Sequence, residues 1–169
     1  MTQHEQGLTT IWGAASHQGR RRSLNEDGYL ASGRVFFVAD GMGGHEAGEV
    51  ASAEALAALS GLADVDRVEP ALVEAFHEIA QQRVRAIETD SGNAPGTTLT
   101  GVLVDEREDV PYWLFVNVGD SRTYMLSNGL LTQVSVDHSE VQELVDACTI
   151  TMDHARIHPR RNVNTRACL

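Results

Sequence analysis

Residues 35–44 have the sequence VFFVADGMGG, in which two kinds of pattern meet. Val35–Ala39 is an uninterrupted apolar run, short and rich in β-branched and aromatic residues, which predicts a buried strand. The run stops at Asp40, and the glycines after it allow backbone angles that other residues avoid. From Glu46 onward the apolar residues recur at helical spacing. The stretch therefore predicts a strand, a tight glycine-rich turn and a helix in succession.

Two helices are expected after this turn. The first extends from Glu46, and Gly61 is a suitable residue at which to end it. Pro70 suits the start of the second helix, because proline at the first helical position loses no hydrogen bond. Apolar residues then line one face of this helix, at Leu72, Val73, Phe76, Ile79, Ala80 and Val84. A loop over Ser91–Gly96 is expected from its composition.

The remaining sequence predicts short strands and two short helices. The four expected strands are Thr98–Val104, Pro111–Val118, Ser121–Leu126 and Leu130–Val134. A hairpin-like turn is expected over Asp105–Asp109, and a tight turn over Ser127–Gly129. The expected helices are Val141–Ala147 and Asp153–Ile157. Strands with short connections imply an antiparallel meander, so the fold class is α+β, with helices layered on sheets.

Charge and length exclude several classes of function. A chain of 169 residues fits a single domain. It has 13 basic residues, all arginine, against 24 acidic ones, for a formal net charge of −11. Nucleic-acid binding usually needs a basic face, so we expect no nucleic-acid partner. No apolar stretch approaches the roughly 20 residues of a membrane span, so we expect no membrane partner.

The cysteines and the N-terminus bear on location. Cys148 and Cys168 do not form a metal-binding pair by their spacing, so two reduced thiols are the default. Met1–Gly7 is polar and lacks the apolar segment of a signal peptide. These features favour a cytoplasmic location.

Three polar clusters carry the possible chemistry: Arg22–Asp27 (RSLNED), Asp40–His45 (DGMGGH) and Gly119–Arg122 (GDSR). Carboxylates at strand ends are costly to bury unless they share a partner, and Mg²⁺ or Mn²⁺ prefers such oxygen ligands. A metal-activated water is a nucleophile at neutral pH, and an arginine binds a tetrahedral anion in bidentate fashion. Together these groups describe hydrolysis of a phosphate ester.

Each cluster taken alone has a more ordinary explanation. An Asp-Gly pair after a strand is more often a turn, and Asp120 before Ser121 also suits a turn. Arg22 ends a run of three arginines, which is more often a solvated patch. His45 precedes a helix, where it could be a helix-start residue with no chemical role. The order of the clusters, rather than any one of them, carries the functional interpretation.

In that order the chain resembles the bacterial metal-dependent serine/threonine protein phosphatases, the type 2C family. The resemblance extends from about Trp12 to the end of the chain. It rests on the segments RSLNED, VADGMGGHEAGEVAS (Val38–Ser52), GTTL (Gly96–Leu99), NVGDSRTY (Asn117–Tyr124) and DHS (Asp137–Ser139). It implies an antiparallel β-sandwich flanked by helices, and hydrolysis of phosphoserine or phosphothreonine in proteins.

The resemblance also implies a set of metal ligands for Mn²⁺ or Mg²⁺. Asp40 corresponds to the aspartate that bridges two metals, and Gly41 to the glycine whose carbonyl binds one of them. Asp27 and Glu26 correspond to residues that hold the metals through water. Asp120 is similar to the aspartate that binds a third, looser metal in bacterial members.

Two further residues are implied in catalysis. Arg22 resembles the arginine that binds the substrate phosphate, and His45 is a candidate for proton transfer to the leaving oxygen. Thr97 and Thr98 are interpreted as packing and loop anchors. The implied partners are phosphorylated proteins, the substrates of serine/threonine kinases.

The sequence departs from the family pattern at its C-terminal side. Two later blocks of the family, which supply further metal-binding aspartates and strands, have no counterpart after Asn164-Thr165-Arg166. Residues 1–169 are therefore expected to form a single phosphatase-like domain that lacks its C-terminal strands. Asn164 and Cys168 also occupy positions where the family usually has apolar or small residues.

Two alternatives to phosphatase activity follow. One is a truncated, non-catalytic relative that binds phosphoproteins or one metal without turnover. The other is a nucleotide-binding enzyme that uses the glycine-rich loop. The second is disfavoured, because the G-x-x-x-x-G-K-[ST] pattern is absent and the chain has no lysine.

Overall fold

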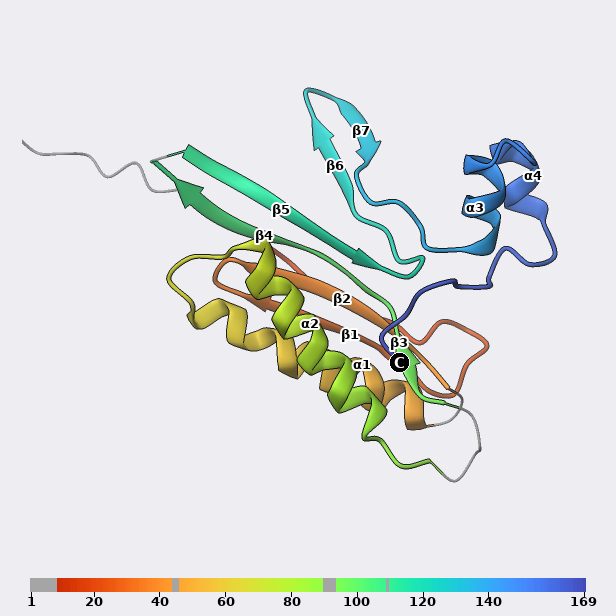
Figure 1. Cartoon of the computed structure of the whole chain (residues 1–169), viewed down its shortest axis with the longest axis horizontal. Helices are drawn as coiled ribbons and strands as arrows, with labels where there is room; N and C mark the ends of the chain where they lie inside the picture. The colour runs from red at the N-terminus through yellow and green to blue at the C-terminus, as the bar shows by residue number, and fades with distance from the viewer. Residues whose placement is uncertain (1–8, 44–45, 90–93, 109) are drawn as a thin grey trace, which may run out of the picture.

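The computed structural model describes residues 9–43, 46–89, 94–108 and 110–169. Its elements, in chain order, are β1 (Asp27–Ser32), β2 (Val35–Met42), α1 (Glu46–Leu59), the 3₁₀ helix η1 (Ser60–Asp64), α2 (Pro70–Arg85), β3 (Gly96–Thr97), β4 (Leu99–Arg107), β5 (Val110–Val118), β6 (Tyr124–Ser127), β7 (Leu130–Gln133), α3 (Glu140–Asp146) and α4 (Met152–Ile157). Figure 1 shows α1 and α2 lying side by side against the larger sheet. The predicted α+β class is confirmed.

The larger sheet is antiparallel, with strand order β1-β2-β4-β5 and with β3 paired to β2. Alternate residues of β2, namely Val35, Phe37 and Ala39, are buried in the core that the sheet forms with α1 and α2. Successive side chains of a strand point to opposite faces, so Phe36, Val38 and Asp40 lie on the other face. Asp40 is therefore carried by a strand whose opposite face is fixed in the core.

Several details of the expected strands are wrong, and the short β3, which includes Gly96 of the expected loop, was not predicted. Strand β1 was not predicted, because Asp27–Ser32 (DGYLAS) mixes small, polar and apolar residues; pairing with β2 makes it a strand. Strand β4 continues to Arg107, so the turn over Asp105–Asp109 is shorter than expected. The strand expected from Ser121 begins only at Tyr124.

The expected meander is also interrupted. Strands β6 and β7 pair with each other in a separate two-stranded sheet, which stands away from the larger one in Figure 1. Their connection is the predicted tight turn, with positive φ at Asn128 and Gly129. Among the described residues, the second sheet of the expected sandwich consists of this hairpin.

The helices at the end of the chain agree with the expected pattern. Ser139 caps α3 by accepting a hydrogen bond from Gln142 N, and Thr151 caps α4 from His154 N. Helix α4 ends before Pro159, which cannot continue it. No helix in the described ranges combines the length and apolar character needed to cross a bilayer.

Candidate active site

Asp27 and Asp40 are directly opposite each other on β1 and β2. Like charges at such positions repel, since facing side chains on neighbouring strands lie close together. Partial burial raises the pKa of Asp40 to about 6, and the neighbouring Asp27 carboxyl adds to the shift by charge repulsion and by a hydrogen bond. The positive charge of Arg22 lowers the pKa of Asp40 and the negative charge of Asp120 raises it, so both groups interact electrostatically with Asp40. The structure thus brings these four predicted residues into one electrostatic environment.

The backbone of Asp40 is fixed by two threonines. Thr98 N donates to Asp40 O (2.9 Å), and Asp40 N donates to Thr98 Oγ1 (3.1 Å). Thr97 Oγ1 donates to the same Asp40 carbonyl (3.1 Å). Both threonines are buried, and they lie where β3 gives way to β4. They therefore hold the carboxylate-bearing end of β2 in place, as the anchoring interpretation expected.

Gly41 is packed against backbone on both sides. Its N–H donates to Glu26 O (3.2 Å), and a side chain at this position would overlap the carbonyl of Gly48 in the first turn of α1. A side chain at Gly48 would in turn overlap the Glu26 carboxylate. A glycine at position 41 therefore allows the turn after β2 to touch both the start of α1 and the segment before β1. The metal-binding role of its carbonyl stays a prediction.

Glu26 links the arginine cluster to this site. Arg22 Nη1 lies 3.4 Å from Glu26 Oε2, and the Arg22 side chain is 69% exposed. Glu26 Oε1 is buried without a hydrogen-bond partner in the described structure. Such an oxygen costs free energy unless something binds it, so it is a candidate acceptor for a metal-bound water. Arg22 and Glu26 also line a shallow hollow of about 280 Å³ with Arg21, Ser23 and Leu24.

Asp120 lies in the turn that follows β5. Gly119 has φ +103°, and a side chain there would come within 2.6 Å of Thr98 Cγ2, so the turn packs tightly on β4. Ser121 Oγ bonds Thr98 Oγ1 at 2.6 Å, which ties the turn to the residue that anchors Asp40. Asn164 Nδ2 donates to Asp120 Oδ1 (3.0 Å).

One ion pair in this region was missed by the sequence reasoning. Arg122 Nε donates to both carboxylate oxygens of Asp137 (3.0 and 2.9 Å), and Gln133 Nε2 donates to Oδ1 of the same aspartate (3.0 Å). Asp137 is buried, and its hydrogen bonds with Arg122 hold the pKa of the guanidinium above its ordinary value. Arg122 and Asp137 both belong to segments that carry the family resemblance, but the resemblance implied no role for either residue.

The described residues contain only part of the predicted ligand set. His45 lies outside the described residues. Within the residues that the structure describes, no group of three or more His, Cys, Asp or Glu side chains is close enough to hold a metal. Asp27 and Asp40 therefore form a partial oxygen-donor set, with the buried Glu26 oxygen and Asp120 at its margin.

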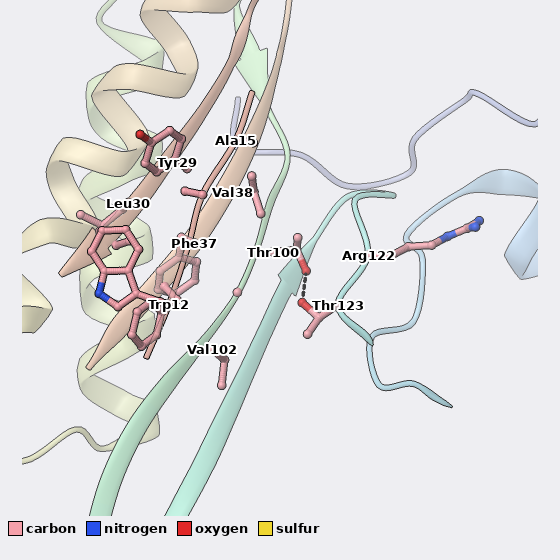
Figure 2. A pocket seen from close by; sticks show the side chains of 15 residues that line it. Trp12, Ala15, Tyr29, Leu30, Phe37, Val38, Thr100, Val102, Arg122 and Thr123 are labelled. Atoms are coloured by element: carbon pink, nitrogen blue, oxygen red, sulfur yellow. Dashed lines mark hydrogen bonds between the residues drawn. The ribbon is translucent and has the colours of Figure 1, made fainter. Parts of the chain in front are cut away.

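A second hollow, of about 360 Å³, lies on the sheet face turned away from the helices. Figure 2 shows Trp12 beside the strands and the Thr100–Thr123 hydrogen bond (2.8 Å), with the Arg122 side chain directed away. Trp12 packs at a tilted angle against Phe36. The described residues that line this hollow include no carboxylate, so the hollow does not contribute to the cluster around Asp40.

The larger sheet, its two helices and the carboxylate–arginine cluster lie within a segment that matches a known protein family. The family model for protein phosphatase 2C matches residues 16–144. The chain therefore belongs to the protein phosphatase 2C family.

Known relatives agree with this assignment. The serine/threonine protein phosphatase PstP of Mycobacterium tuberculosis is 39% identical over 165 residues, which cover 95% of this chain and 31% of that protein. A crystal structure of the M. tuberculosis phosphatase PstP/Ppp gives a TM-score of 0.82 at 39% identity, over 91% of this chain and 66% of that one. A catalytic-domain structure of PstP in complex with two manganese ions gives 0.72 at 36% identity, over 91% and 64%. The chain thus spans under a third of the PstP sequence and about two thirds of the solved chains.

Proposed function

We propose that this chain hydrolyses phosphoserine or phosphothreonine in proteins with the help of Mn²⁺ or Mg²⁺. The observation that carries the proposal is the register of the larger sheet, which sets Asp27 opposite Asp40. A pair of facing carboxylates weakens the sheet unless a cation or a proton lies between them. Burial is the main cause of the raised pKa of Asp40, and the facing Asp27 carboxyl raises it further.

The donor chemistry fits a hard divalent cation. Asp40 and Asp27 provide carboxylate oxygens, Glu26 provides a buried oxygen without a partner, and Asp120 adds a further carboxylate nearby. Similarity to a PstP structure that contains two manganese ions supports this choice. When bound, the metal would lower the pKa of a coordinated water and so supply the nucleophile.

The protein's own side chains would bind and orient the substrate. Arg22 is exposed and close enough to influence Asp40, so its guanidinium is available to a phosphate group beside the carboxylates. Glu26 contacts Arg22 and would keep the guanidinium over the site. In the reaction a water oxygen bonds to phosphorus as the bond to the serine or threonine oxygen breaks. His45 stays a prediction as the group that protonates that oxygen.

Other parts of the proposal concern organisation and surroundings. The described residues share one main hydrophobic core, which supports a single phosphatase-like unit over residues 1–169. Both cysteines are free thiols, Cys148 exposed and Cys168 buried, as suits a reducing cytoplasm. The proposed partners are phosphorylated proteins, without nucleic acid or membrane.

A second candidate function is binding of phosphoproteins without turnover. It is favoured by the exposure of Arg22, whose guanidinium can bind an anion whether or not a metal is held nearby. Under this alternative, a phosphopeptide binds to the protein in EDTA and Arg22→Ala abolishes binding. If the protein hydrolyses the phosphopeptide, binding is a step of catalysis instead.

Hydrolysis of p-nitrophenyl phosphate in Mn²⁺ tests the main proposal. Asp40→Asn is expected to abolish the activity, whereas Asp64→Asn, an exposed aspartate in η1, is the matched control and should retain it. A folded wild-type chain with no Mn²⁺-dependent turnover would contradict the proposal and leave the binding alternative. Activity unaffected by Asp40→Asn would contradict the assigned site.

A further inference from the structure

Asn164 contacts the carboxylate of Asp120 across a long separation in the chain. Its Nδ2 donates to Asp120 Oδ1 at 3.0 Å. Such a bond to a charged acceptor is among the stronger hydrogen bonds in proteins. It occupies one oxygen of Asp120 and leaves the other free for a cation.

The backbone around both residues is fixed by a shared neighbour, His138. His138 N donates to Gly119 O (2.8 Å), and Gly119 N donates to His138 Nδ1 (3.2 Å). On the other side, Thr165 N donates to His138 O (2.9 Å). Asp120 follows Gly119 and Asn164 precedes Thr165, so each lies next to a residue that is hydrogen-bonded to His138. The backbone therefore keeps Asp120 and Asn164 close to each other.

The side-chain oxygen of Asn164, in contrast to its nitrogen, makes no hydrogen bond within the described chain. Its Oδ1 is buried and has no hydrogen-bond partner. Leaving a buried acceptor unsatisfied costs free energy, and an apolar residue of similar size would avoid that cost. Packing alone therefore favours leucine over asparagine here. The amide is explained by what its N–H does to Asp120.

We propose that Asn164 is a positioning residue that orients the Asp120 carboxylate for a divalent cation. The inference rests on the proposed function, because it takes Asp120 to be a metal ligand. It goes beyond the family resemblance, in which the position of Asn164 is usually apolar or small. Groups that orient a metal ligand typically change metal affinity by about 10- to 100-fold when removed.

Mn²⁺ binding to the full chain, followed by electron paramagnetic resonance of the free ion, tests the proposal. Asp120→Asn first identifies the part of the binding that depends on Asp120. Asn164→Leu is expected to weaken that same part by about tenfold or more. In the Asp120→Asn background, Asn164→Leu should have no further effect. Asn162→Leu, an exposed asparagine two residues away, is the matched control and should bind Mn²⁺ like the wild type.

The outcomes separate this inference from the proposed function. Asn164→Leu removes both the unsatisfied oxygen and the bond to Asp120, whose effects on stability oppose each other, so thermal unfolding in EDTA should change little. Equal weakening in both backgrounds would show a general structural effect and overturn the inference, as would no weakening at all. If Asp120→Asn leaves Mn²⁺ binding unchanged, the inference fails, while Asp40-dependent hydrolysis would still support the proposed function.

Discussion

Thr98 and Ser121 share a hydrogen bond of 2.6 Å between their hydroxyl groups, and this bond joins the two carboxylate-bearing segments of the site. Thr98 also exchanges two bonds with the backbone of Asp40, while Ser121 follows Asp120 directly. The relative position of two aspartates far apart in sequence thus depends on one threonine. Because Thr98 is buried, water is no ready substitute for any of these three bonds.

Replacing Thr98 with valine, which has nearly the same shape, should destabilise the protein by about 1–3 kcal/mol, since the Asp40 N–H and the Ser121 hydroxyl each lose a partner. Ser121→Ala should cost less, about 1 kcal/mol, because the Thr98–Asp40 bonds survive. Urea-induced unfolding of the two variants measures the difference. Equal losses would mean that the bond to Asp40 adds nothing to stability.

Asp27→Asn is expected to act in opposite directions on stability and on metal binding. Without metal it removes the repulsion opposite Asp40 and should stabilise the fold by about 0.5 kcal/mol. With Mn²⁺ present, the same substitution should reduce the stabilisation that the bound ion confers, because the negative charge of the Asp27 carboxylate is lost. Thermal melts in EDTA and in Mn²⁺ provide the comparison. A variant less stable than the wild type under both conditions would contradict the repulsion argument.

Stability should depend on pH through Asp105, which is far from the candidate site. Burial alone would raise the pKa of Asp105, but hydrogen bonds and a nearby charge outweigh it and hold this pKa below its ordinary value. The groups responsible are Val68 N, Glu106 N, the Tyr112 hydroxyl and Arg34. Because the folded-state pKa is depressed, the contribution is complete above the unfolded pKa and is lost as pH falls through the folded one.

The substitution Asp105→Asn therefore should destabilise the protein by about 2 kcal/mol near neutral pH. The difference from wild type should shrink below about pH 4, where the Asp105 carboxylate of the unfolded wild-type chain begins to be protonated while that of the folded protein is still charged. Unfolding in urea at several pH values measures this difference. A pH-independent difference would show that packing, rather than the charge, is responsible.

Arg122→Met should leave the buried Asp137 carboxylate without its bidentate partner. Gln133 alone would then donate a side-chain hydrogen bond to it, so we expect a loss of about 2 kcal/mol, reduced because Arg122 is half exposed. Hydrogen exchange should rise in β6 and β7, since the pair connects the start of this hairpin to the segment that follows it. Arg156→Met, which breaks the exposed pair with Asp153, is the control and should have little effect.

Strand β2 was predictable from its uninterrupted apolar run, and helices α1 and α2 from apolar residues at helical spacing. Strand β1 was not, because its conformation comes from pairing with β2 rather than from its own side chains. The facing of Asp27 and Asp40 is a matter of register, which a sequence without a recognised β1 cannot provide. The resemblance nevertheless grouped both residues in one site.

Contacts between distant turns were beyond the reach of sequence patterns. Nothing in the residues around Asn164 indicates that its amide meets Asp120, since the contact depends on how His138 holds both segments. The same is true of the pair formed by Arg122 and Asp137, whose partners are separated by the whole β6–β7 hairpin. Local pattern predicts elements, and tertiary hydrogen bonds decide which polar groups meet.

The close packing of Gly41 on Gly48 has a consequence for how this protein can vary. A side chain at Gly41 would overlap backbone atoms of Gly48 and Glu26, whereas a side chain at Gly48 would chiefly overlap the Glu26 carboxylate. A second substitution cannot move backbone out of the way at Gly41, but a shorter residue at position 26 would make room at position 48. In a library that randomises codons 26, 41 and 48, functional clones should therefore retain glycine at position 41, while position 48 should change only together with position 26.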